Sequence, residues 1–228
     1  MGKKGLGSRM LVFPNLTQLD LTGPYEVLAE PPAAETLMSC KTLNPVRSEH
    51  GLTILPMATL STCPTLDLVF VPGGAGINPL LEDAEVLAFL RRAAAAARYF
   101  VSVCTGARVL GAAGLLRGRC AATHWMSRDL LRAFGAEPVA DRVVVDGKIF
   151  TGGGVTAGID VALTVAAEIA GRATAEAIHL AIEYGPAPPF GSGSPETADP
   201  AVLAAVLAWA ETCQRDRAER VARAAAAL

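Results

Sequence analysis

RYFVSVCTGARVLGAAGLL, residues 98–116, contains the change of hydrophobic period that decides the fold. Residues 99–103 are apolar, aromatic and β-branched, a composition typical of a strand that is buried on both faces. From residue 105 to residue 116 the apolar side chains recur at helical spacing instead. Cys104 lies at the junction, so the sequence predicts that a tight strand-to-helix turn presents its side chain. Gly106 would allow another backbone segment to approach this turn closely.

Cys104 is the candidate nucleophile of the chain. The free N–H groups and the positive dipole end of the following helix would both favour the thiolate. The same kind of turn presents the nucleophilic serine of hydrolases with another fold. The alternative is a small, unreactive core residue, because free cysteine is among the most buried residue types. The remaining cysteines lie on no comparable turn and form no C-x-x-C pair, which indicates neither a zinc site nor a paired redox motif; they are Cys40, Cys63, Cys120 and Cys213.

The composition predicts one globular domain spanning residues 1–228. An apolar content of 51% over 228 residues is enough for a large single core. A net charge of −2, with a pI near 5.9, gives no electrostatic reason to expect nucleic acid or an anionic membrane as a partner. An odd number of cysteines without framework spacing favours a reducing compartment, and neither a signal peptide nor a membrane span is recognisable. We therefore expect a cytoplasmic protein.

Strands and helices alternate along most of the chain, which predicts a parallel α/β sandwich. The first strand, residues 10–13, has a weak start because glycine and serine precede it. The dipeptide Asp146-Gly147 predicts a hairpin turn, and Asp199-Pro200 predicts the start of a long C-terminal helix. Further strands are expected at 35–43, 51–57 (a small strand or hairpin arm), 66–71, 99–103, 143–145 and 148–151, and further helices at 22–30, 83–97 (capped by Asp83), 105–116, 127–134, 155–170 and 173–184.

Several glycine-rich or acidic segments fall directly after predicted strands. In a parallel sheet these ends meet at one edge, where open α/β folds bind their ligands. Gly73 and Gly74 form part of a P-G-G-A-G turn, which we interpret as an oxyanion-binding turn facing the Cys104 thiol. This makes Gly74 a substrate-binding candidate; the turn matches no nucleotide-binding motif. Residues 152–154 follow a later strand, and Asp20 follows the first one.

Two side chains compete for the role of proton carrier. Asp20 is expected in a loop just ahead of a helix that Thr22 caps and Pro24 opens. Its alternative role is that of a solvated loop carboxylate or a capping group. His124 follows a short apolar stretch, so it could reach the same edge, and Cys–His pairs are common in thiol catalysis. Its alternative role is that of a structural histidine beside Trp125.

The motifs L-D-L-T-G-P-Y-E-V-L, V-P-G-G-A-G, S-V-C-T-G-A-R-V-L-G-A-A-G-L-L, T-H-W and T-G-G-G-V-T-A-G-I-D together resemble the ThiJ/PfpI-like superfamily. Among its members they are most similar to those that hydrate isocyanides. Asp20 is the distinctive residue, because many relatives have glutamate there, although D-L-T-G-P also occurs in the sensor domains of AraC-like regulators. The resemblance implies a flavodoxin-like sheet, a homodimer, and the hydration of an isocyanide by water to an N-substituted formamide, with no metal and no organic cofactor.

The resemblance also implies roles for individual residues. Cys104 matches the nucleophile and Asp20 the general acid/base. Thr105 matches the residue after the nucleophile that lines the pocket. Gly153 and Val155 match a glycine and an aliphatic residue beside the cysteine, so we expect them to contact substrate.

The implied mechanism is covalent. The Cys104 thiolate would attack the terminal carbon of the isocyanide while protonated Asp20 supplies a proton, and water would then resolve the thioimidate. Burial and the thiolate charge should raise the pKa of Asp20. One alternative is another enzyme of the superfamily, of the glyoxalase or peptidase type, which contact between His124 and Cys104 would favour. The other is a non-enzymatic sensor domain with Cys104 as an oxidisable thiol, although the final helix of mixed charge contains no helix-turn-helix.

Overall fold

The computed structural model describes residues 7–62 and 67–228, and its centre is a seven-stranded sheet. The strand order is β10-β11-β7-β6-β1-β2-β5, and every neighbouring pair is parallel except β10–β11. The predicted α/β class with a flavodoxin-like parallel sheet is therefore confirmed. The strands of this sheet are β1 (Gly7–Leu11), β2 (Glu35–Cys40), β5 (Ala58–Thr59), β6 (Leu68–Val71), β7 (Tyr99–Val103), β10 (Val143–Asp146) and β11 (Ile149–Gly152).

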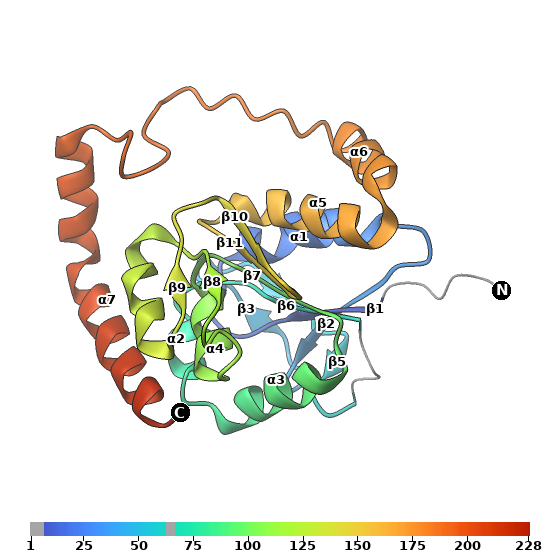
Figure 1. Cartoon of the computed structure of the whole chain (residues 1–228), viewed down its shortest axis with the longest axis horizontal. Helices are drawn as coiled ribbons and strands as arrows, with labels where there is room; N and C mark the ends of the chain where they lie inside the picture. Colours follow the sequence, from blue (N-terminus) through green and yellow to red (C-terminus); the bar gives the residue numbers. More distant parts are fainter. Residues whose placement is uncertain (1–6, 63–66) are drawn as a thin grey trace.

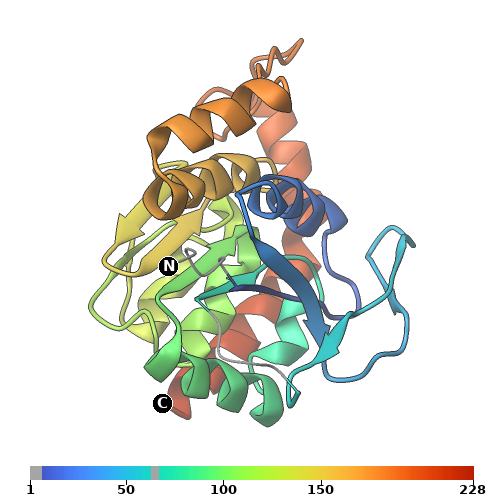
Figure 2. The same ribbon diagram turned by 90° about the vertical axis from the view of Figure 1, so that its right-hand side faces the viewer.

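Two small two-stranded sheets stand beside the main one. An antiparallel hairpin consists of β3 (Val46–Arg47) and β4 (Thr53–Ile54), so the predicted hairpin arm at 51–57 is present in shorter form. A parallel pair consists of β8 (Cys120–Ala121) and β9 (Glu137–Pro138). The segment that carries the β3–β4 hairpin projects from the body of the molecule (Figure 2).

Helices cover both faces of the main sheet (Figure 1). The first and fifth helices pack together on one face, and the sixth packs on the fifth. The third and fourth lie on the other face, while the last helix runs along one end of the molecule, reached by an extended segment (Figure 1). The helices are α1 (Gln18–Ala29), α2 (Ile77–Leu80), α3 (Ala84–Ala96), α4 (Ala107–Ala112), α5 (Ala157–Ala170), α6 (Arg172–Ala181) and α7 (Pro200–Ala226). Within the described ranges, none of them combines the length and apolarity needed to cross a membrane.

The first strand lies further toward the N-terminus than predicted, at Gly7–Leu11 rather than at residues 10–13. Its small and charged residues do not prevent strand formation, because β1 is paired on both sides, with β2 and β6. Arg9 is buried in this strand and donates a hydrogen bond from Nη1 to Oγ of Ser39 at 2.8 Å. The predicted first residue of the next core strand, Leu66, lies outside the described residues, as does Cys63.

Helix α1 begins earlier than predicted, which moves Asp20 from a loop into a helix. Its N-cap position is Thr17 rather than Thr22, and Asp20 lies in the first turn. Pro24 is inside the helix instead of at its start, where a proline removes one backbone hydrogen bond. Helix α5 approaches this proline so closely that a Cβ added to Gly158 would lie 2.9 Å from Pro24 Cγ. Packing between α1 and α5 thus overrides the usual preference of proline for the first helical turn.

Three other predicted helices differ in length or type. A 3₁₀ turn at Cys104–Gly106 precedes α4, which ends at Ala112, shortly before Gly114 adopts φ +81°. The predicted helix at 127–134 consists of the 3₁₀ segments Trp125–Ser127 and Asp129–Phe134. Helix α6 ends at Ala181 instead of residue 184.

Three predicted boundaries agree with the structure. The Asp83 carboxylate accepts hydrogen bonds from the N–H groups of Glu85 and Val86 and caps α3. The Asp146-Gly147 turn joins β10 to β11, and α7 begins directly after its cap, Asp199. Helix caps and tight turns depend on residues that are close in the sequence, so the sequence predicts these three boundaries correctly.

Candidate active site

The carboxyl ends of β6, β7 and β11 meet at one edge of the sheet, as predicted. The register pairs Val71 with Ser102 and Gly152 with Val103, so the segments that follow these strands begin side by side. Cys104 is the first residue after β7. It therefore lies between the glycine-rich turns that follow the two neighbouring strands.

The backbone of Cys104 is held in an unusual conformation. Its φ is +54°, in the left-handed region that non-glycine residues rarely adopt. The Cys104 N–H donates to the carbonyl of Gly153 at 2.7 Å. Its carbonyl accepts from Oγ1 of Thr123 at 2.6 Å and from the N–H of His124 at 3.3 Å. These three hydrogen bonds stabilise the conformation that presents the thiol. The first of them gives the carbonyl of Gly153 a structural role.

Gly106 allows the turn after Cys104 to pack directly on the preceding strand end. A Cβ at this position would clash with the carbonyl oxygen of Val71 and would lie 2.8 Å from that of Pro72. Both obstacles are backbone atoms, which cannot move aside as a flexible side chain could. The predicted close approach at Gly106 is therefore confirmed.

The Asp20 carboxyl group reaches Cys104 from the first turn of α1. It is fully buried, and its Oδ2 accepts a hydrogen bond from the N–H of Gly73 at 2.8 Å. Asp20 and Cys104 affect each other's pKa, which shows that the two side chains are neighbours. The second carboxyl oxygen, Oδ1, is buried and has no hydrogen-bond partner among the described residues. A Cβ added to Gly73 would lie 2.6 Å from Asp20 Oδ2 and 2.8 Å from Cys104 Cβ. Only glycine fits at position 73 between the acid and the thiol.

Burial governs the protonation of this pair. Burial, with a smaller contribution from the charge of Glu49, raises the pKa of Asp20 to about 7 despite the N–H of Gly73. The predicted direction for Asp20 and its main cause, burial, are therefore correct, but Cys104 lowers this pKa by hydrogen bonding instead of raising it by charge as predicted. The pKa of the Cys104 thiol is also raised well above its usual value, by burial first and by the Asp20 charge second, although the N–H of Thr105 opposes this. The N–H of Thr105 favours the thiolate in the predicted direction, but desolvation by burial outweighs it.

The hydroxyl of Thr105 holds the glycine turn after β6 in place. Its Oγ1 accepts from the N–H of Gly74 at 2.9 Å and donates to the carbonyl of the same residue at 3.2 Å. Gly74 has φ +127°, and a Cβ there would lie 2.7 Å from the carbonyl oxygen of Asn15. The N–H groups of Gly73 and Gly74 are thus both engaged within the protein, by Asp20 and Thr105. The predicted oxyanion-binding function of these two amides is wrong, even though Gly74 lines the site.

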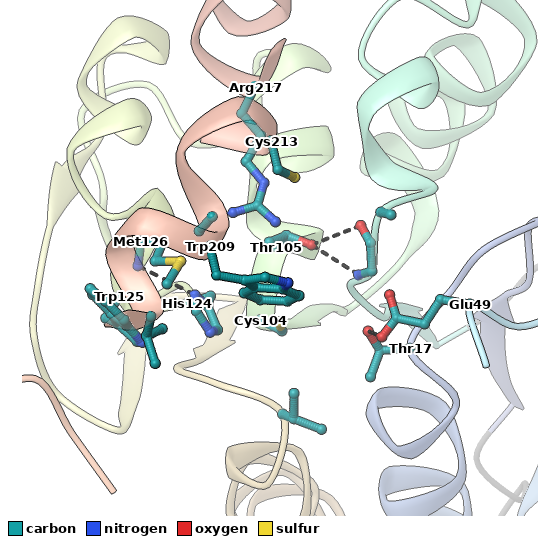
Figure 3. Close-up of a pocket in the computed structure, with 15 residues that line it drawn as sticks. Thr17, Glu49, Cys104, Thr105, His124, Trp125, Met126, Trp209, Cys213 and Arg217 are labelled. Carbon is teal, nitrogen blue, oxygen red and sulfur yellow. Dashed lines mark hydrogen bonds between the residues drawn. The ribbon is translucent and has the colours of Figure 1, made fainter. Parts of the chain in front are cut away.

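A pocket of about 380 Å³ opens above Cys104 (Figure 3). Four of the predicted residues line it, namely Gly74, Cys104, Thr105 and Val155. Gly153 and the fully buried Asp20 are not among its lining residues. The carbonyl of Gly153 accepts the Cys104 N–H instead. The other lining residues are Thr17, Glu49, Ala75, His124, Trp125, Met126, Val206, Trp209, Ala210, Cys213 and Arg217.

Helix α7 supplies one wall of the pocket, which was not predicted from the sequence. Val206, Trp209, Ala210, Cys213 and Arg217 come from this helix, and Figure 3 shows Trp209 and Arg217 pointing into the pocket from it. Their spacing of three or four residues places them on one helical face. This stripe on one face of α7 could have indicated that the helix lines the pocket, but the many charged residues around it obscure the pattern.

Glu49 is the second missed residue. It lies on the loop between β3 and β4, and its Oε1 accepts a hydrogen bond from Oγ1 of Thr17 at 2.8 Å. This contact ties the projecting hairpin to the start of α1 at the edge of the pocket. Nothing in the local sequence around Glu49 indicates the contact, because it depends on how the hairpin folds back.

His124 lines the pocket as a neutral side chain. Burial and the charges of Arg217 and Arg108 lower its pKa to about 4. Its Nδ1 accepts from the N–H of Met126 at 3.3 Å, and its ring stacks on Trp125 at a centroid distance of 5.8 Å. In the part of the chain that the structure describes, no hydrogen bond joins this ring to Cys104. The same part contains no cluster of three or more His, Cys, Asp or Glu side chains suited to a metal ion.

Known proteins resemble this chain over most of its length. Residues 9–168 match the DJ-1/PfpI family. The isonitrile hydratase of Pseudomonas putida is 55% identical over 96% of this chain and 96% of its own length. The HTH-type transcriptional regulator GbdR of Pseudomonas aeruginosa is 32% identical over 74% of this chain, but the match covers 48% of that protein. A solved THiJ/PfpI family protein from Pseudomonas syringae has a TM-score of 0.93 and 42% identity, covering 95% of this chain and 90% of that one.

Proposed function

The chain belongs to the DJ-1/PfpI family, and from this membership and the geometry of its pocket we propose that it is a hydro-lyase that converts isocyanides, R–N≡C, to N-substituted formamides. The observation that carries the proposal is a fully buried carboxyl group, that of Asp20, next to a cysteine that lines a pocket. This arrangement occurs in a chain that is 55% identical to an isonitrile hydratase over nearly its full length.

The first step is addition of the thiol across the terminal carbon. Sulfur of Cys104 forms a bond to that carbon, and the proton shared by Cys104 and Asp20 moves to the same carbon. The product is a thioimidate, R–N=CH–S–Cys104, and Asp20 is left as a carboxylate. A shared proton suits this step, because the same pair supplies both the nucleophile and the acid.

The second step is hydrolysis of the thioimidate. The Asp20 carboxylate accepts a proton from water while the water oxygen adds to the carbon, and Asp20 passes this proton to the nitrogen, which gives R–NH–CH(OH)–S–Cys104. The tetrahedral intermediate then collapses to R–NH–CHO: the C–S bond breaks, and Asp20 accepts the hydroxyl proton, so that the Cys104–Asp20 pair regains the proton it held at the start. One carboxyl group thus serves in both directions, as the raised pKa of Asp20 allows.

The remaining predicted residues contribute by position. We assign Val155 and Gly74 to contact with the substituent of the isocyanide, because both line the pocket. The N–H of Thr105 lowers the pKa of the Cys104 thiol, so it would stabilise negative charge on the sulfur, whereas the Thr105 hydroxyl is occupied by Gly74. Gly153 acts by holding the Cys104 backbone.

The glyoxalase-type and peptidase-type alternatives depended on contact between His124 and Cys104. The described hydrogen bonds of the His124 ring go elsewhere, and its low pKa makes it a poor base at neutral pH. Asp20 is therefore the better candidate for proton transfer.

We also propose that residues 1–228 form one domain, that the protein works as a homodimer, and that it acts in the cytoplasm. Exposed apolar side chains around the projecting hairpin support self-association; they include Leu43, Leu52, Leu55 and Met57. The four described cysteines form no disulfide, which fits a reducing compartment.

The direct test is incubation of the protein with a para-substituted phenyl isocyanide while formamide is measured. We expect formamide from the wild type, none from Cys104→Ala or Cys104→Ser, and almost none from Asp20→Asn, with circular dichroism showing that all variants are folded. Substantial activity in any of these variants would contradict the mechanism. Absence of formamide with the wild type would contradict the proposed reaction itself.

A further inference from the structure

Two guanidinium groups lie together at one side of the pocket. Arg217 points into the pocket from α7 (Figure 3). Arg108, on α4, is fully buried nearby, and the charges of the two groups act on each other. Among the ion pairs of the described residues, none involves either of them. Each is therefore a cation without a carboxylate partner.

Arg217 is held in a fixed orientation by Gln214. The Gln214 side chain donates to the carbonyl of Met126 at 2.6 Å, and its Oε1 accepts from Nη1 of Arg217 at 2.7 Å. The Nε of Arg217 is buried and, within the described ranges, has no hydrogen-bond partner. A buried donor without a partner is costly unless a ligand or water satisfies it. The guanidinium is thus pre-positioned with hydrogen-bonding capacity to spare.

Arg108 is buried next to Arg217 and adds to the positive potential at this side of the pocket. Its Nη1 donates to Oδ1 of Asn78 at 3.0 Å, and the Asn78 amide in turn binds the Asp216 carboxylate at 2.7 Å. Its Nε and Nη2 are buried without partners among the described residues. Burial and the charge of Arg217 lower the pKa of Arg108 to about 9, as expected for a cation that lacks a compensating anion.

The two carboxyl groups of the site, Asp20 and Glu49, make their described hydrogen bonds elsewhere. Asp20 accepts from the N–H of Gly73, and Glu49 accepts from Thr17 at the edge of the pocket formed by the start of α1. Aromatic and aliphatic groups also line the walls of the pocket. A ligand that places its reactive end at Cys104 would therefore extend along an apolar wall of the pocket toward the positive charge of Arg217.

We propose that the natural substrate is an isocyanide that also carries a carboxylate, and that Arg217 binds this carboxylate while the isocyano carbon lies at Cys104. This inference rests on the proposed isocyanide hydration. It assigns Arg217 as a specificity-determining residue outside the residues of the reacting pair. Guanidinium suits the role because its planar array of donors matches a carboxylate.

The test compares para-isocyanobenzoate with its neutral methyl ester, measuring kcat/KM for formamide production. We expect the wild type to prefer the acid by about tenfold or more, the range expected for a charge-assisted hydrogen bond. Arg217→Gln should bring the acid-to-ester ratio near one, mainly through KM for the acid. Arg217→Lys should restore part of the preference, because it retains the charge but not the planar array. Because both substrates react at the same thiol, any effect of Arg217 on the reactivity of Cys104 changes both values of kcat/KM equally and leaves the acid-to-ester ratio unchanged.

Arg215→Gln is the matched control. Arg215 lies on the same helix, is largely exposed and pairs with Glu211, so its removal should leave the ratio unchanged. Equal use of acid and ester by the wild type, or an equal loss of both in Arg217→Gln, would overturn the inference.

A binding measurement separates this inference from the proposed reaction. Calorimetry with Cys104→Ser should show that para-formamidobenzoate binds about tenfold or more tightly than its methyl ester, and that Arg217→Gln removes the difference. If neither isocyanide yields formamide but the acid still binds selectively, the proposed reaction fails and the anion site stands. If formamide forms but acid and ester bind alike, the anion site fails and the reaction stands.

Discussion

In the proposed reaction, a single buried carboxyl group, that of Asp20, controls how the sulfur of Cys104 reacts. Burial raises the pKa of both groups, and the charge of Asp20 also raises that of Cys104. Because the protonation of one group affects that of the other, the two side chains titrate as a pair. Below about pH 7 the pair holds two protons, and the sulfur is then a neutral thiol beside a neutral acid. Above that pH one proton remains, and the pair can supply a nucleophile and an acid together.

The activity should therefore rise with pH through the pKa of Asp20. We expect kcat/KM to increase through about pH 7 and to fall again when the pair loses its last proton at high pH. Glu49→Gln removes a negative charge that raises the pKa of Asp20, so the acidic limb of the profile should move to lower pH. Glu85→Gln, a change on the distant α3, is the control and should leave the limb in place. An acidic limb that does not move in Glu49→Gln would contradict this assignment.

The same burial predicts that Asp20 reduces stability at neutral pH. Its pKa is about 7 in the folded protein and 3.8 in the unfolded chain. Its contribution is thus most favourable below pH 3.8 and is lost as the pH rises through 7. An asparagine side chain at this position does not titrate, so Asp20→Asn should raise the free energy of unfolding at pH 8 by on the order of 4 kcal/mol, with little change near pH 4.

Urea denaturation of the two proteins at both pH values measures this difference. A gain in stability that is the same at pH 4 and pH 8 would show that titration of Asp20 is not its cause.

At the level of secondary-structure elements, the decisive feature is the junction of β7 and α4. The strand, the turn at Cys104 and the glycine two residues later form one local unit, and for that reason they could be predicted from the sequence. The pairing of this unit with β6 and β11 followed from the rule that parallel strands end at one edge.

Gly106→Ala tests this junction. The added Cβ would meet the backbone carbonyls of Val71 and Pro72, so we expect a loss of several kcal/mol, roughly 3 or more, in the free energy of unfolding and a loss of activity. Gly185→Ala is the control, because nothing lies within 4 Å of a Cβ there, and its stability should stay within about 0.5 kcal/mol of wild type. Thermal denaturation of both variants makes the comparison. Near-wild-type stability in Gly106→Ala would mean that this close approach is not maintained.

At the level of the whole molecule, the limits of sequence-based reasoning become clear. The position of Asp20 opposite Cys104 was expected, but its placement inside α1 depends on packing against α5, which the sequence does not state. Glu49 and Arg217 reach the pocket from a hairpin and from the last helix, far from Cys104 in the chain. Contacts of this kind arise from long-range folding and have no local motif.

The exposed apolar side chains of the hairpin segment yield a prediction for the assembled protein. If the homodimer forms through this segment, the double variant Leu52→Asp and Leu55→Asp should elute as a monomer, because it places charge where apolar surface would be buried. Val145→Asp, at a similarly exposed site on β10, should leave the assembly unchanged. Light scattering coupled to size-exclusion chromatography measures both. A dimeric double variant would exclude the hairpin as the interface.

Helix α7 follows an extended connection and lies beyond residues 9–168, the part that matches the family. The proposed anion-binding Arg217 is therefore separated along the chain from the proposed reacting pair, Cys104 and Asp20. Under this proposal, substitutions in the last helix would change one determinant of substrate choice, while the sulfur, its acid and the substituent contacts of Gly74 and Val155 stay the same.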